Sequence, residues 1–146
     1  MGLVDATIYL KGDLLDPNFV TKTLGIEPER SWRKGEKRTA KRPGAKTYVA
    51  KTGLWTTGMW KHPLVDDDIP HEVPVIIDEL LQRFNGRKEP LDQIAGVENA
   101  FLDILILGNV KEEMGGTEFI LSKGQIQKIS RLGLAIYTTT SFSEKK

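Results

Sequence analysis

A short basic segment holds most of the side chains that could recognise a partner. From Arg30 to Lys46 the chain has eight Lys or Arg residues and one acid, Glu36. The whole chain of 146 residues has a formal net charge of only +1, so this positive charge is local. Guanidinium and ammonium groups pair with carboxylates and phosphates, and an adjacent tryptophan such as Trp32 can anchor an interface or stack on a base. The segment is therefore the first candidate for a binding surface.

The candidate binding residues combine these cations with two tryptophans. They are Arg30, Trp32, Arg33, Lys34, Arg38, Lys41, Arg42 and Trp60. Trp60 follows Gly58 and Met59 in what reads as a loop, so we expect it as an exposed contact or lid residue. Trp55 is expected inside a strand, packed in the core.

Three interpretations of the basic segment stay open at this stage. It can be a solvated loop, neutralised in part by the acids Asp66–Asp68 and Glu72 on another loop. It can steer an acidic protein partner, with Trp32 and Trp60 as desolvated anchors. It can bind single-stranded nucleic acid, although domains of that class are usually basic overall and this chain is nearly neutral. Of the two binding functions, the sequence favours the acidic protein partner.

Catalytic chemistry has little support in the residues. The chain has no cysteine, no Gly-x-Ser-x-Gly turn and no glycine-rich phosphate loop. Asp66–Asp68 lacks the spacing of a calcium loop, and His62 and His71 lack further ligands at metal-binding spacing. We therefore predict no catalytic residue, no metal and no cofactor, and a non-enzymatic binding module.

The location and organisation of the chain follow from its composition. The first residues lack the pattern of a signal peptide, and no apolar run approaches the ~18 residues of a membrane span. The lack of cysteine fits a reducing compartment. We expect a cytoplasmic protein with one domain over residues 5–140 and a polar tail over 141–146. The residues do not decide between a monomer and a dimer.

The first half of the chain predicts one strand, one helix and a longer β region. Residues 5–10 alternate like a strand. Asp16 and Pro17 then mark a helix start, and Gly25 marks its end. Residues 46–55 read as one strand, or as two strands broken at Gly53, and residues 58–68 read as loop.

The second half contains the clearest helix. Apolar residues recur at helical spacing over residues 73–84, and Pro74 fits the first turn. Strands are predicted at 101–107, 118–121 and 134–140. Ser122 and Gln125 form a capping box for a third helix that buries Ile126, Ile129 and Leu132. Neighbouring strands arrive partly in pairs, so the predicted fold class is α+β, with a single mainly antiparallel sheet and about three helices packed on it.

These motifs carry a family resemblance. The steps Leu24-Gly25-x-x-Pro28 and Lys34-Gly35-Glu36, a strand bearing Trp55 and a last strand with Tyr137 resemble the bacterial family called domain of unknown function 4279. The resemblance spans roughly residues 5–140. The last strand, Leu-Ala-Ile-Tyr, lacks the acids that the family tends to carry there. The family brings no established activity; the resemblance implies at most an immunity-type protein encoded beside a toxin.

Overall fold

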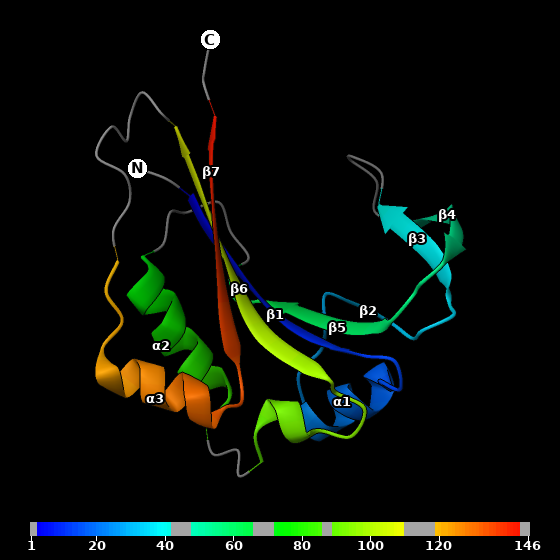
Figure 1. The fold of residues 1–146 in the computed structure, drawn as a ribbon, viewed down its shortest axis with the longest axis horizontal. Coiled ribbons are helices and arrows are strands. Elements are labelled where there is room, and N and C mark those ends of the chain that lie inside the picture. Colours follow the sequence, from blue (N-terminus) through cyan, green and yellow to red (C-terminus); the bar gives the residue numbers. More distant parts are fainter. Residues whose placement is uncertain (1–2, 42–47, 66–71, 86–88, 110–118, 144–146) are drawn as a thin grey trace.

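The part of the chain that the structure describes forms a five-stranded sheet, three α-helices and a separate two-stranded hairpin (Figure 1). The computed structural model describes residues 3–41, 48–65, 72–85, 89–109 and 119–143. The main sheet contains β1 (Leu3–Gly12), β2 (Arg30–Trp32), β5 (Gly58–Pro63), β6 (Asn99–Asn109) and β7 (Ala135–Ser143). The predicted α+β class is confirmed.

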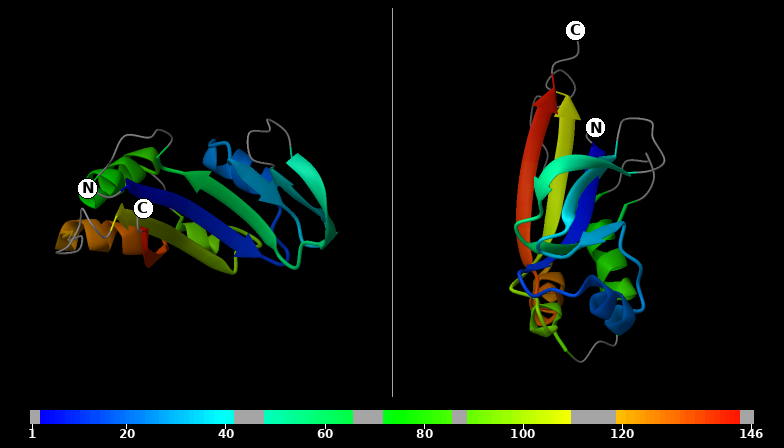
Figure 2. Two further views of the ribbon diagram at one scale, coloured as in Figure 1. Left: turned by 90° about the horizontal axis from the view of Figure 1, so that it is seen from above. Right: turned by 90° about the vertical axis from the view of Figure 1, so that its right-hand side faces the viewer.

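The other elements complete the domain. The helices are α1 (Pro17–Leu24), α2 (Val73–Arg83) and α3 (Lys123–Arg131), with a 3-10 turn η1 (Leu91–Gln93). The hairpin, called the arm below, consists of β3 (Lys37–Lys41) and β4 (Tyr48–Leu54). The arm lies at the opposite end of the molecule from α2 and α3 (Figures 1 and 2).

The strand order of the main sheet is β2-β5-β1-β6-β7, which puts the first strand of the chain in the middle. The pairs β2–β5, β5–β1 and β1–β6 are antiparallel, whereas β6 and β7 run parallel. A parallel pair needs a crossover between its strands, and α3 lies in this crossover. The sheet is therefore mixed and mostly antiparallel, as predicted.

All three helices cover the same face of the sheet. Alternate residues of the strands point to that face and are buried there, among them Ile8 and Leu10 of β1 and Leu102 and Ile104 of β6. They pack against apolar residues of the helices, which include Val20 of α1, Ile77 and Leu80 of α2, and Ile129 of α3. None of the described helices lies on the opposite face, which is called the helix-free face below. Trp32 is buried to 7% exposure but lies outside this core cluster, because it points to the helix-free face.

The helix boundaries follow the capping signals of the sequence. The Asp16 side chain accepts hydrogen bonds from two backbone N–H groups of α1, and Gly25 closes that helix with φ 67°. Pro74 lies in the first turn of α2, and Ser122 with Gln125 forms the predicted capping box of α3. Ile126 is nevertheless 51% exposed, since α3 turns only Ile129 and Leu132 toward the core.

Several boundaries differ from the sequence-based expectation. Residues 58–63 form strand β5 rather than loop, because pairing with β1 and β2 on both sides satisfies their backbone groups. The described residues 119–121 lie outside any strand, whereas a strand was expected over 118–121. Strand β7 continues to Ser143, into the segment expected as a polar tail. Part of the basic segment forms β3 of the arm instead of a loop.

Candidate functional site

Arg30 joins the arm to the main sheet. It lies in β2 opposite Lys61, and its guanidinium donates hydrogen bonds to the backbone oxygen and the hydroxyl of Thr39 in β3. The same group lies over two indole rings, 5.1 Å from the centre of Trp32 and 5.3 Å from that of Trp55. Arg30 therefore has a structural task in the free protein, since its guanidinium lies beside both stacked rings and its N–H groups bind the arm.

The two tryptophans form the base of the arm. Their ring centroids are 3.7 Å apart with an interplanar angle of 11°, so the rings stack. The indole N–H of Trp32 donates to the backbone oxygen of Thr57 at 3.0 Å. The backbone of Trp55 exchanges hydrogen bonds with that of the turn before β3, at Gly35 and Glu36. Trp55 is thus half-buried just after β4 and packs on the helix-free side, not in the core where it was expected.

Arg33 and Lys34 already have acidic partners within the chain. Arg33 donates to the carboxylate of Asp16 at 2.8 Å, and Lys34 lies 3.3 Å from that of Asp13. A hydrogen bond from Thr57 and the contact with Lys34 hold the pKa of Asp13 below its ordinary value of 3.8. Intramolecular neutralisation therefore occurs with acids near α1. The acids expected from the sequence, Asp66–Asp68, lie outside the described residues.

Arg38 and Lys37 are cations of the arm whose side chains the structure shows exposed to solvent. Both are exposed, and no acidic side chain among the described residues forms an ion pair with Arg38. The Arg38 guanidinium lies 5.4 Å from the ring centre of Trp55. Lys41 belongs to β3, while Arg42 lies outside the described residues. The structure thus separates the predicted cations into paired, structural and exposed groups.

Trp60 is not an exposed contact. It lies in β5 with 0% exposure, on the helix-covered face of the sheet. Its indole N–H donates to the hydroxyl of Thr21 in α1 at 3.1 Å. The expectation that Trp60 is an exposed anchor is wrong, because the strand alternation of β5 points this side chain into the core.

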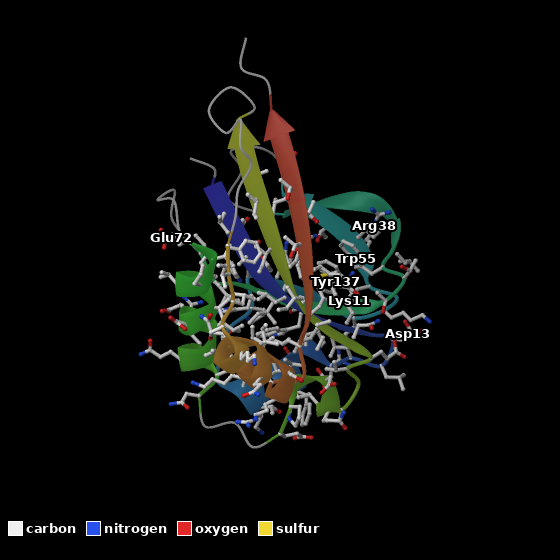
Figure 3. The ribbon with its side chains drawn as sticks, turned by 60° about the vertical axis from the view of Figure 1, so that its left-hand side comes forward. Lys11, Asp13, Arg38, Trp55, Glu72 and Tyr137 are labelled. Carbon is white, nitrogen blue, oxygen red and sulfur yellow. The ribbon has the colours of Figure 1, made fainter. Side chains whose placement is uncertain are left out.

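An aromatic row on the helix-free face was missed by the sequence analysis. Tyr9 of β1 stacks on Phe101 of β6 with centroids 5.1 Å apart, and Phe101 meets Tyr137 of β7 edge-on at 4.7 Å. Lys11 places its ammonium group 5.9 Å from the Tyr9 ring centre and 5.5 Å from that of Phe101. Figure 3 shows Tyr137 and Lys11 on the same side of the sheet as Trp55 and Arg38.

The row could not be found without the strand order. Alternation along residues 5–10 places Tyr9 on the face opposite Ile8 and Leu10, but it does not say which strands lie beside β1. Only the register Tyr9 to Phe101, and Asp103 to Tyr137, brings these rings together. Burial and the nearby acids, Asp103 first, raise the pKa of the Tyr9 phenol above its ordinary value of 10.0.

His62 lies in a shallow hollow on the other side of β5. The hollow is lined by Gly25, Ile26, His62, Pro63 and Arg83. The His62 ring has both nitrogens engaged, Nδ1 at 2.9 Å from the Glu27 backbone oxygen and Nε2 at 3.0 Å from the Arg83 guanidinium. This arrangement fixes the ring and leaves neither nitrogen free to take a metal or a substrate proton.

The described residues show no centre for metal chemistry and no membrane-spanning helix. No group of three or more His, Asp or Glu side chains in the described ranges is placed to hold a metal ion. Among those same ranges, no helix is long and apolar enough to cross a membrane. The side chains that the structure brings together on the helix-free side are aromatic and cationic, which suits binding of an anionic or planar group.

Comparison with known proteins identifies one family. Neither the curated proteins nor the solved structures contain a significant match. The family described as "Domain of unknown function (DUF4279)" matches residues 3–143, which is nearly the whole chain. The matched region includes all the strands and helices described above. The chain therefore belongs to the DUF4279 family, whose function is unknown, and the resemblance seen in the sequence is confirmed.

Proposed function

We propose that this chain is a non-enzymatic, cytoplasmic binding module that holds an acidic protein partner against the arm and the adjoining helix-free face. The observation that carries the proposal is the pair Arg38 and Trp55 at the base of the arm. Arg38 is exposed and lies on the half-buried indole of Trp55. Arginine beside a partly covered aromatic ring is the usual composition of an interface anchor.

The fixed base of the arm supports this proposal. Arg30 and the stacked Trp32 and Trp55 hold the arm on the sheet before any partner arrives. A binding element that is already ordered loses little conformational entropy on association. Lys37 and Arg38 then project from a fixed position, so the charges act through both steering and contact.

A protein partner is favoured over nucleic acid by the charges of the helix-free face. Asp5 and Asp103 lie there, with Asp103 opposite Tyr137 of the aromatic row. They would repel the evenly spaced phosphates of a nucleic acid laid along this face, whereas a protein can place its carboxylates against the arm and uncharged residues against the face. Arg33 and Lys34 are already neutralised by Asp16 and Asp13. The narrower form of the proposal is an immunity-type module that occludes a toxin, which we expect from the family resemblance alone.

Single-stranded nucleic acid is the second candidate, and the row of Tyr9, Phe101 and Tyr137 is the observation that favours it. Aromatic rings on an open sheet face can stack on bases, and Lys11 adds a cation to the same row. Trp32 cannot serve as the stacking platform, because it is buried under Trp55.

The test compares two double charge reversals with the same change in net charge. K37E/R38E alters the exposed cations of the arm, and K22E/K128E alters exposed lysines on α1 and α3. Each variant and the wild type is used to capture proteins from lysate of the source cells at low and high salt. The captured protein is then purified, and its rate of association with the wild type and with each of the two variants is measured. Binding of a labelled single-stranded oligonucleotide to the same three proteins is measured in parallel.

We expect one acidic protein to be captured by the wild type and by K22E/K128E. Its association rate with K37E/R38E should fall by about tenfold or more, because the steering charge is reversed at the contact. Equal association rates for K37E/R38E and K22E/K128E would contradict the proposal. Oligonucleotide binding that falls steeply with salt and is lost in Y137A would support the second candidate instead.

A further inference from the structure

Among the described residues, strand β7 is an edge strand that no second strand or bulge protects. Within that part of the chain it pairs with β6 alone and keeps register over its whole length, from Phe101 opposite Ala135 to Asn109 opposite Ser143. Its sequence, AIYTTTSFS, contains no charged residue, no proline and no glycine. Natural proteins blunt a long edge strand with charges, proline, a bulge or a covering segment, because a bare edge pairs with other chains.

The middle of β7 is also exposed on both of its faces. Tyr137, Thr139 and Ser141 point to the helix-free face, and all three are exposed. Thr138 and Thr140 point to the helix-covered face, yet they are exposed as well. Residues 137–141 therefore extend past the helix layer, as Figure 1 shows for the upper part of β7.

The opposite edge of the main sheet is different. Strand β2 has only three residues, Arg30–Trp32, and the turn after it leads directly into the arm. Its first and last residues, Arg30 and Trp32, belong to the cluster that holds the arm on the sheet. Within the described sheet, β7 is thus the edge that offers a long row of backbone donors and acceptors.

We propose that β7 pairs antiparallel with β7 of a second copy of this chain, so that two five-stranded sheets become one continuous sheet. A strand that pairs with its own copy places its residues opposite one another across a two-fold axis. Like charges opposite each other destabilise such a pair, and β7 has none. The run of Thr138, Thr139 and Thr140 supplies the β-branched side chains that favour cross-strand packing.

The positions of the charges favour a second copy of the chain, rather than the acidic partner, as the molecule that pairs with β7. The exposed cations Lys37 and Arg38 belong to the arm, beside β2, at the other edge of the sheet. Strand β7 offers an acidic segment no cation. This inference is independent of the proposed function, and it uses a different edge of the molecule.

Pairing about an axis normal to the sheet preserves the two faces. The helix layers of both copies then lie on one side, and the two helix-free faces join on the other. Tyr137 is 55% exposed and Leu107 is 41% exposed, both on the helix-free face close to this edge. A strand added beside β7 covers part of Tyr137, which removes apolar ring surface from water.

The test uses opposite charges placed at two exposed positions of β7. Variants T138K/T140K and T138E/T140E are made in the full chain, because residues 138 and 140 flank the centre of the strand. When two copies of β7 pair antiparallel near this centre, residue 138 or 140 of one copy lies opposite residue 138 or 140 of the other. At least one pair of introduced charges is therefore brought together. The control, N18K/T23K, makes the same charge change as T138K/T140K at exposed positions of α1.

Sedimentation equilibrium over a wide concentration range gives the dimer dissociation constant. We expect the wild type and N18K/T23K to dimerise equally, and each β7 variant alone to dissociate about tenfold or more readily. An equimolar mixture of T138K/T140K and T138E/T140E should recover the dimer, since opposite charges then face each other. Circular dichroism of each variant confirms that the fold is kept.

Three results would overturn the inference. One is a wild-type protein that stays monomeric at every concentration. Another is a dimer whose dissociation constant is unchanged in both β7 variants, which would assign the dimer to another surface. The last is weakening by N18K/T23K as strong as that by T138K/T140K, which would assign the effect to net charge alone.

Discussion

At the scale of single residues, Arg30 shows that a cation in a basic segment need not be available to a partner. Its guanidinium binds Thr39 and lies beside the stacked rings of Trp32 and Trp55. Arginine suits this place because its planar, weakly hydrated group can lie against aromatic rings and still donate hydrogen bonds. The charge that defines the segment in the sequence is therefore partly used to build the structure.

Trp32 should be the residue of this cluster that matters most for stability. It is only 7% exposed, so W32A leaves a large void and should lower the free energy of unfolding by about 3 kcal/mol. L54A, at a 60% exposed position of the arm, should change it by less than about 0.5 kcal/mol. Urea unfolding of both variants measures the difference, and equal stabilities would show that the stack does not stabilise the fold.

His62 should make stability depend on pH in a defined direction. Burial lowers its pKa below the ordinary 6.5; the hydrogen bond to the Glu27 carbonyl opposes this shift, and the Arg83 charge adds to it. The neutral ring, protonated on Nδ1, donates to Glu27 and accepts from Arg83. As pH falls below about 6.5 the unfolded chain takes up the proton first, so the free energy of unfolding decreases until the folded pKa is passed.

The measurement is the free energy of unfolding at a series of pH values for the wild type, H62Q and H71Q. H62Q should lose the decrease that begins near pH 6.5, while H71Q should lose none of it if His62 is its source. A decrease that persists unchanged in H62Q would assign it to another group. The imidazole signal of His62, assigned by its loss in H62Q, reports the folded pKa directly.

At the scale of elements, local signals predicted the helices well and the sheet less well. The N-cap Asp16, the Gly25 stop and the apolar stripe of α2 are each set by neighbours within a turn or two, so the sequence carries them. Strand β5 is set by partners far away in the chain. Its six residues include Gly58, His62 and Pro63, which read as loop until β1 and β2 are placed beside them.

The candidate site divides in the same way. Local charge correctly marked Arg38 as an exposed cation, because a polar strand in a hairpin needs no distant partner to stay at the surface. Trp60 was misplaced because burial depends on which face of β5 meets α1. The row of Tyr9, Phe101 and Tyr137 was missed because three strands from distant parts of the chain contribute one ring each.

The capping box of α3 is an element with a testable contribution. Ser122 accepts from the Gln125 backbone N–H at 3.1 Å, and the Gln125 side chain accepts from the Ser122 N–H at 3.0 Å. The same Gln125 amide donates to Pro74 and Asp78 of α2, so the box also joins two helices.

S122A should lower the free energy of unfolding by about 1 kcal/mol, since one N-terminal N–H loses its acceptor. S130A removes an equal hydroxyl from an exposed position later in α3 and should change it by less than about 0.5 kcal/mol. Thermal and urea unfolding of the pair provide the test. Equal effects of the two substitutions would show that the box adds nothing beyond helix propensity.

At the scale of the whole molecule, the two proposed contacts lie at opposite edges of one sheet. The arm adjoins β2, and β7 forms the other edge, with three strands between them. The helix-free face connects these edges, and its aromatic row lies on β1, β6 and β7. A dimer through β7 therefore leaves both arms free to hold a partner.

The central place of β1 also has a consequence for how the chain is made. During synthesis β1 is finished long before β5 and β6, the two strands that border it. Until residues 99–109 leave the ribosome, one side of β1 has no native strand to pair with, and its apolar residues lack much of their core. The nascent chain therefore carries an incomplete, association-prone strand from the synthesis of β1 until that of β6.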